Sequence, residues 1–320
     1  MLKRILYILL IGYVFQNVNA ASMQPLPYPI EQDLPVVVIL NQYEMQVDVP
    51  DSSAVASQFG LLGALIGAAV DSTATKNAEA RIAAIRNLMI DYNFNQKFEQ
   101  AIRASLATPG IAVNPQITIA RSTGEIANSI PKPRPAEVVT NLTITPRYSI
   151  SNDFETVSLT MTVQYISTTL KPNGKTKQAY NFSRIYKFNI PMDPVKGSQA
   201  TEDSNRWAEL GSKQLMLLAD QSIKQVTDMF AFDFSTEGRA LSAQSNKGLK
   251  VTFKGNTYSG RELRRTEDFV WVQSGKDWAQ TIQGYQPITG IPTEAINATE
   301  KLDGSPSQTT LPAVAEGKNG

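Results

Sequence analysis

Residues 138–190, VVTNLTITPRYSISNDFETVSLTMTVQYISTTLKPNGKTKQAYNFSRIYKFNI, decide the predicted fold. Apolar residues alternate with Thr, Ser and Gln along this stretch, most regularly between Val157 and Tyr165. Successive side chains of a β-strand point to opposite faces, so a period of two predicts strands with one buried and one polar face. Asn173 and Gly174 separate two alternating runs, a position where this pair favours a tight hairpin turn. We therefore expect an antiparallel β-meander.

Helical periodicity flanks this meander on both sides. Residues 73–90 and 201–232 carry apolar side chains at spacings that favour one buried helix face, and Trp207 is expected to anchor the second of these helices in the core. Residues 36–49 and 117–120 are expected to be strands. A further helix is predicted by apolar residues at a strict i+4 spacing, which are Phe94, Phe98, Ile102 and Leu106. The helices can cover the apolar face of the meander, which predicts the α+β class.

A second run of strands is predicted after residue 248. Val251 and Phe253 alternate with polar residues, and Val270 and Val272 mark a further strand, so we expect a small C-terminal β segment. Its basic and aromatic side chains can bind an anionic or sugar ligand through charge and stacking. The alternative is a solvated strand face with ordinary core aromatics. The residues of this possible ligand surface are Arg261, Arg264, Arg265, Trp271 and Trp278.

Residues 52–70, SSAVASQFGLLGALIGAAV, contain no charge and are predicted to form an apolar, glycine-rich helix. At 1.5 Å per residue such a helix is about 30 Å long, which matches the hydrocarbon thickness of a bilayer. Small residues recur along it at spacings that let a second backbone approach closely, as in a glycine zipper. These helix-packing residues are Ala56, Gly60, Gly63, Ala64, Gly67 and Ala68.

Two placements of this helix stay open. Gln58 lies within it, Asp51 and Asp71 flank it, and no Lys, Arg, Trp or Tyr directly adjoins it to mark a membrane interface. These features favour a helix that is buried in a core or packed in an oligomer over one that is embedded in lipid.

The N-terminus has the pattern of an export signal. Lys3 and Arg4 precede an apolar run over residues 5–14, and small residues offer a cleavage site after Ala20. An N-terminal membrane anchor is the less favoured alternative, because the apolar run is short for a membrane span. We expect a periplasmic or secreted protein, with membrane association left open.

Composition limits the chemistry. The chain has no Cys, which excludes disulfides, and no His, which excludes Ser-His-Asp catalysis and ordinary zinc sites. Its 30 basic and 29 acidic residues nearly cancel, so no long-range attraction to nucleic acid or to anionic lipid is expected. Because no nucleophile motif or phosphate-binding glycine loop is present, we predict no catalytic residue, no metal and no cofactor.

The predicted organisation follows from these patterns. A signal peptide (1–20) and an extended lead-in (21–34) precede a main α+β domain (35–240), a small β subdomain (248–286) and a tail expected to be disordered (287–320).

Three functions remain open. The favoured one is a non-enzymatic envelope protein whose glycine-rich helix packs against a membrane, a second copy or a partner protein. A periplasmic binding or accessory module with that helix in its own core is the first alternative. The second is an enzyme that cleaves glycans with a pair of carboxylates, although no spacing singles out such a pair.

Overall fold

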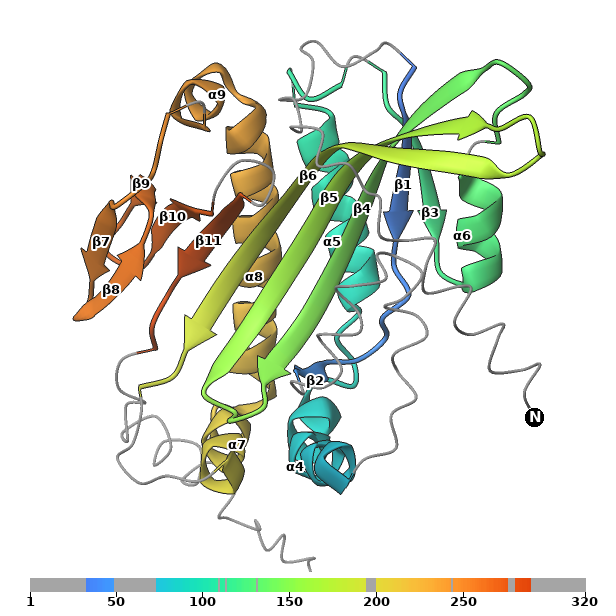
Figure 1. The fold of residues 1–320 in the computed structure, drawn as a ribbon. Coiled ribbons are helices and arrows are strands. Elements are labelled where there is room, and N and C mark those ends of the chain that lie inside the picture. Colours follow the sequence, from blue (N-terminus) through green and yellow to red (C-terminus); the bar gives the residue numbers. More distant parts are fainter. Residues whose placement is uncertain are drawn as a thin grey trace, which may run out of the picture.

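Three long strands form the centre of the fold in the computed structural model (Figure 1). They are β4 (Val138–Ser151), β5 (Thr156–Leu170) and β6 (Thr176–Pro191), and each is antiparallel to the next. The turn between β5 and β6 contains Gly174 at a φ of 74°, and the Gly174 N–H donates to the Lys171 carbonyl at 2.9 Å. The predicted Asn-Gly hairpin turn is therefore confirmed. The structure describes residues 33–48, 73–108, 110–112, 114–130, 132–193, 200–242, 244–275 and 280–288.

Parallel strands flank this antiparallel centre on both sides. β1 (Pro35–Ile39) is parallel to β4 on one side and to β3 (Gln116–Ala120) on the other. β11 (Thr281–Tyr285) is parallel to β6, and β10 (Val270–Ser274) and β9 (Arg261–Arg265) complete the sheet. With β2 (Gln46–Asp48), which pairs with β4, the described residues contribute nine strands to this sheet. The α+β class is confirmed, whereas the antiparallel meander accounts for only part of a mixed sheet.

The predicted small C-terminal β segment is matched only in part. β9, β10 and β11 belong to the main sheet, and only the hairpin of β7 (Lys250–Phe253) and β8 (Asn256–Ser259) forms a sheet of its own. Both faces of β10 are buried, because Val270 and Val272 pack with Val251 and Phe253 of β7 while Trp271 enters the main core. Sequence periodicity gives the faces of a strand but not its neighbours, so the parallel pairing of β11 with β6 was not predicted.

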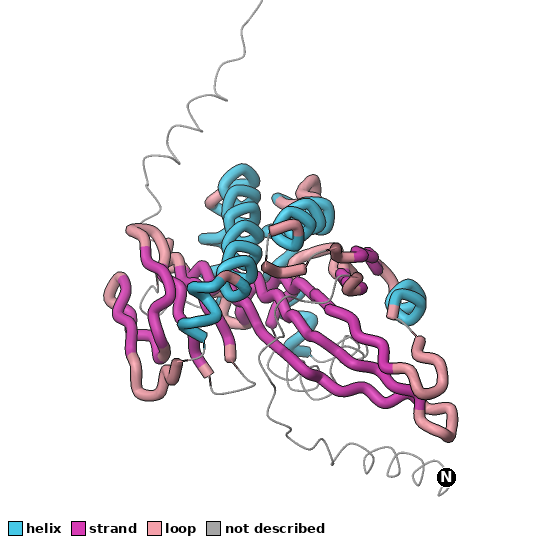
Figure 2. Tube along the Cα trace, turned by 90° about the horizontal axis from the view of Figure 1, so that it is seen from above, coloured by secondary structure: helices cyan, strands magenta, loops and turns pink. Residues whose placement is uncertain are grey.

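Helices cover one face of the sheet, where α5 and α8 stand side by side (Figures 1 and 2). The helices of this layer are α4 (Thr73–Leu88), α5 (Phe94–Leu106), α7 (Ala200–Glu209) and α8 (Gly211–Phe234). The i+4 stripe of α5 is buried as predicted, with its four apolar side chains in the main core. Trp207 of α7 is fully buried and its indole N–H donates to the Phe154 carbonyl at 2.7 Å, which confirms its anchoring role.

One long helix over residues 201–232 was predicted, and the structure corrects it to two. α7 ends at Glu209 and α8 begins at Gly211, which has a φ of 73°. A positive φ is incompatible with a continuous right-handed helix, and glycine adopts it without steric cost. The break lets α8 change direction and run along the sheet.

The short helix α6 (Thr123–Ser129) lies on the other face of the sheet. Val36 and Val38 of β1 enter the core under α5, whereas Val37 and Ile39 pack with Ile126 of α6. The chain therefore passes from β1 through α5 to β3 on one face and returns from β3 through α6 to β4 on the other. β1 and β3 form the point at which the connections change sides.

Several predicted segments lie outside the described residues. They are the signal peptide, most of the lead-in, the glycine-rich helix with all its packing residues, Trp278 and residues 289–320. Among the helices that the structure describes, none combines the length and the apolar character needed to cross a bilayer.

Gly238 and Gly124 provide a matched test of packing, because each lies in a seven-residue helix. A Cβ at Gly238 of α9 (Thr236–Ser242) would lie 1.9 Å from the Phe232 carbonyl oxygen, whereas nothing lies within 4 Å of a Cβ at Gly124. Gly238→Ala should therefore lower the free energy of unfolding by about 1–3 kcal/mol. Gly124→Ala should be neutral or stabilising by up to about 1 kcal/mol. Urea unfolding measures both, and equal effects would contradict the close approach of α9 to the end of α8.

Candidate functional site

A bulge between β1 and β2 opens the sheet next to β4. Val38 pairs with Ile144, and pairing resumes only where Gln46 meets Ser149, so residues 39–45 lie opposite the shorter run 145–148. Residues 42–45 of this longer run line a pocket.

The side chain of Gln42 takes the place of a missing strand residue within this bulge. Its amide nitrogen donates to the Tyr148 carbonyl, and its amide oxygen accepts the Tyr148 N–H at 3.0 Å. Because both backbone groups of Tyr148 are satisfied, the sheet tolerates the gap in strand pairing. Residues 43–45 are then free to form one wall of a pocket.

The pocket has a volume of about 220 Å³ and an aromatic floor. Phe94 and Tyr148 are buried and stack with ring centroids 5.5 Å apart and an interplanar angle of 6°. Met45 and Met89 contribute flexible apolar side chains. The full lining consists of Gln42, Tyr43, Glu44, Met45, Arg86, Asn87, Met89, Ile90, Tyr92, Phe94 and Tyr148.

Two large apolar side chains are exposed among the residues that line the pocket. Tyr43 is 73% exposed and Ile90 is 79% exposed, and they come from the bulge and from the turn that follows α4. Exposed apolar groups next to an aromatic floor are typical of a surface that a partner covers.

Arg86 fixes the two walls to each other. Its Nε donates to the Met45 carbonyl at 2.8 Å and lies 3.0 Å from a Glu44 carboxylate oxygen, and its Nη1 bonds Glu79. The guanidinium is thereby held by two carboxylates and a carbonyl. It positions the bulge against α4 rather than offering a free positive charge to an anion.

Two of the three phenols that line the pocket, Tyr92 and Tyr148, are held in their neutral form. Burial raises the pKa of Tyr148, and burial together with the Asp220 carboxylate raises the pKa of Tyr92. The Tyr92 hydroxyl donates to Asp220 at 2.8 Å, and Lys97 pairs with the same carboxylate. Neither phenol can therefore act as a base near neutral pH, and the pocket offers contact surface more than proton transfer.

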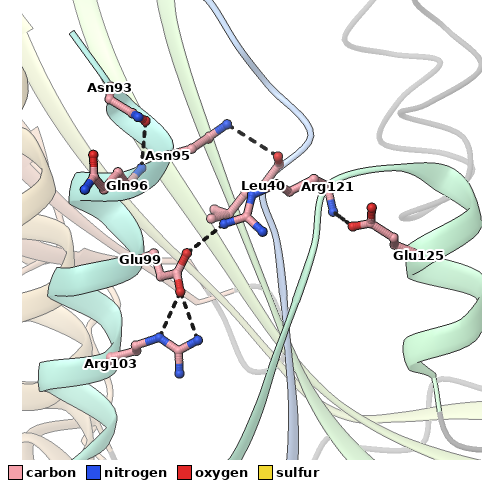
Figure 3. A network of polar contacts seen from close by, with 8 residues as sticks. All are labelled: Leu40, Asn93, Asn95, Gln96, Glu99, Arg103, Arg121 and Glu125. Atoms are coloured by element: carbon pink, nitrogen blue, oxygen red, sulfur yellow. Dashed lines mark hydrogen bonds and ion pairs between the residues drawn. The ribbon is translucent and has the colours of Figure 1, made fainter.

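A polar network holds the ends of β1 and β3 beside this pocket (Figure 3). Glu99 of α5 accepts hydrogen bonds from both Arg103 and Arg121, each at 2.9 Å for the shortest contact. Asn95 donates to the Leu40 carbonyl at 3.5 Å, which places the start of α5 at the carboxyl end of β1. In open α/β sheets ligands bind outside the carboxyl ends of the strands, where successive connections go to opposite faces. The pocket adjoins such a point, and the Tyr43 hydroxyl reaches the Arg121 carbonyl at 3.3 Å.

Arg264 and Arg265 of the ligand surface predicted from the sequence are neighbours on β9 but pack on opposite faces of the sheet, over Trp271 and over Phe253 of β7. Arg264 lies over the ring of Trp271, with its guanidinium carbon 4.4 Å from the ring centroid. Arg265 pairs with Glu262 at 2.6 Å, and Arg261 donates to the Ser245 carbonyl at 2.7 Å. Trp271 is fully buried, so its ring packs inside the protein and not against solvent. Ligand binding at these arginines stays a prediction.

Sequence reasoning missed the pocket. Phe94 was predicted as part of a helix stripe and residues 36–49 as one strand, which is correct for the ends of that range only. The polar residues Asn41, Gln42 and Glu44 interrupt the apolar run and are the signal that could have indicated a bulge.

The described residues contain no group of three or more His, Cys, Asp or Glu side chains placed to hold a metal ion. Comparisons with models of known protein families and with curated proteins give no match to this chain.

Proposed function

We propose that the protein is an exported, non-enzymatic binding module of the cell envelope, whose pocket between the bulge and α4 receives one apolar side chain of a partner polypeptide. The single observation that carries this proposal is the pocket itself, with stacked Phe94 and Tyr148 as its floor and exposed Tyr43 and Ile90 among the residues that line it. The export signal predicted at residues 1–20 supports a location outside the cytoplasm.

The size of the pocket favours a side chain over a whole small-molecule ligand. Pockets that bind drug-sized ligands usually measure roughly 300–1,000 Å³. A volume of about 220 Å³ suits one aromatic ring or one branched aliphatic group. Catalysis is not favoured, because the buried Tyr92 and Tyr148 phenols are neutral and Glu44, the one carboxylate among the described lining residues, is paired with Arg86.

Methionine methyl groups provide a direct test of the pocket. We expect N-acetyl-phenylalaninamide to shift the ¹³C-methyl NMR signals of Met45 and Met89 with a Kd on the order of 1 mM, since one side chain supplies only about 4 kcal/mol. The signal of Met161, which is buried elsewhere in the core, should not move. N-acetyl-glycinamide, which lacks the apolar group, should produce no shift.

A tryptophan introduced at the pocket wall supplies the matched variants. Asn87 lines the pocket and is exposed, so Asn87→Trp should fill it and abolish the shifts without loss of folding. Ala84 is exposed on the same helix and does not line the pocket, so Ala84→Trp should bind as the wild type does. The proposal fails if the methyl signals do not respond, or if both variants lose the response equally.

The glycine-rich segment at residues 52–70 supports a second proposed activity, which is association with a partner protein, a second copy or a membrane. The supporting observation is the GxxxG pair of Gly63 and Gly67, which favours close helix packing. Gly63→Leu should then change the cross-linking pattern or the membrane retention of the full chain. An unchanged pattern and unchanged fractionation would show that the spacing is incidental.

A further inference from the structure

The outer ends of β4, β5 and β6 form an arm that projects from the rest of the sheet (Figures 1 and 2). β1 joins β4 only from Leu142 onward, and β11 joins β6 only from Ile185 onward. The first residues of β4 and of β6 therefore pair with β5 alone among the described strands. Every side chain from residue 171 to residue 181 is exposed. The end of the arm therefore lies at the surface.

The tip of this arm is strongly basic. We define the arm tip by five side chains, all of them exposed, which are Lys132, Arg134, Lys171, Lys175 and Lys177. Glu137 is the one acidic residue nearby in the sequence, and no Asp or Glu occurs between Glu155 and Asp193. The whole chain has a formal net charge of only +1, so this is a local concentration of charge.

The described fold does not use these five side chains in ion pairs. Within the described part of the chain, none of them takes part in an ion pair. The Glu137 carboxylate accepts the backbone N–H of Arg134 at 2.7 Å, which shapes the loop before β4. The positive charge is therefore directed at something outside the described fold.

Apolar side chains accompany the charge. Val138 at the start of β4 is 61% exposed, and Tyr180 of β6 is 38% exposed. Val138 pairs with Thr169, and Tyr180 pairs with Ile166, so the two side chains lie on opposite faces of the arm. Lysines with long apolar stems, a tyrosine and an aliphatic side chain on a projecting tip are the combination that suits the headgroup region of a membrane.

Strand addition to the free edge of β6 is a less suitable use of the arm. The register of β6 shifts next to Tyr165, which leaves Asn181 as an extra residue in the edge. A bulge and edge lysines are the features by which proteins discourage pairing with another strand.

We propose that the arm tip docks on an anionic lipid bilayer. This surface uses no residue of the pocket, so the two sites can act at once. Each basic side chain near an anionic membrane contributes an attraction that raises the partition coefficient by about fivefold at low ionic strength. Exposed charges are screened by salt, so the binding should weaken as the salt concentration rises.

Vesicle co-sedimentation tests the proposal with the full mature chain. The wild type should bind phosphatidylcholine vesicles that contain about 30% phosphatidylglycerol and not pure phosphatidylcholine vesicles, and should dissociate between about 0.1 and 0.5 M NaCl. The Lys175→Gln/Lys177→Gln variant should bind about 25-fold more weakly. Lys247→Gln/Lys250→Gln makes the same charge change at exposed positions near the start of β7 and should bind like the wild type.

Each other outcome overturns the proposal. Equal loss in both variants would show attraction to net charge alone, and no binding by the wild type would exclude a lipid surface. Binding to poly-glutamate without binding to vesicles would assign the arm tip to an acidic polypeptide instead. Far-ultraviolet circular dichroism of the two variants should match the wild type, because all four lysines are exposed.

Discussion

Replacing Asp233 by Asn is expected to lower the free energy of unfolding by about 3–5 kcal/mol. The Asp233 carboxylate receives three hydrogen bonds, from Arg184 at 3.0 Å and from Tyr186 and Ser242 at 2.8 Å each. The side chains of Arg184 and Asp233 are only 10% and 4% exposed. Once Asp233 is neutral, the buried guanidinium has no opposite charge, and the cost of its desolvation is no longer offset.

A surface ion pair of the same helix supplies the control. Lys224 and Asp228 pair on the exposed side of α8, so Asp228→Asn should change the free energy of unfolding by about 0.5 kcal/mol or less. Urea denaturation measures both variants under the same conditions. If the free energies of unfolding of the Asp233→Asn and Asp228→Asn variants differ by less than about 1 kcal/mol, the buried ion pair does not stabilise the fold as its burial implies.

Trp271→Ala is expected to destabilise the protein by about 3–5 kcal/mol, the range for loss of a large aromatic side chain from a core. The ring is fully buried, its N–H donates to Gln225 at 2.8 Å, and Phe269 stacks on it with centroids 5.8 Å apart. The same change leaves the Gln225 amide without a partner in the core, which adds to the cavity cost.

The Arg264→Ala variant distinguishes the packing role of Trp271 from a role of Arg264 in ligand binding. Arg264 is exposed and covers the Trp271 ring, so its removal should cost only about 0.5–1 kcal/mol by loss of the cation–π contact. Thermal unfolding of both variants measures the difference. If the Trp271→Ala variant is nearly as stable as the wild type, the ring does not support the core, and the result would favour the predicted ligand surface.

Local periodicity predicted the elements of the fold well. The period of two gave β4, β5 and β6, and the i+4 spacing of Phe94, Phe98, Ile102 and Leu106 gave the whole buried face of α5. In both cases one face of the element meets one core, so the pattern along the chain matches the pattern of burial.

Pairing between distant strands could not be predicted in the same way. Val36 lies beside Leu142, and Thr281 lies beside Ile185. The local sequence of each strand does not indicate which strand it pairs with. The pocket was missed for a related reason. It depends on the Gln42 side chain bonding the backbone of Tyr148, a contact between residues more than a hundred positions apart.

The position of β11 in the sheet has a consequence for the order of folding. The last described strand lies inside the sheet, between β6 and β10, and not at its edge. Ribosomes add about 5–20 residues per second. The sheet therefore cannot be completed during synthesis until residue 285 has been added. Until then the backbone of residues 185–189 is an unpaired edge, and the many distant pairings make closure slow. We expect this edge of β6 to stay unpaired until β11 has been synthesised. Fragments that end before Thr281 should therefore aggregate.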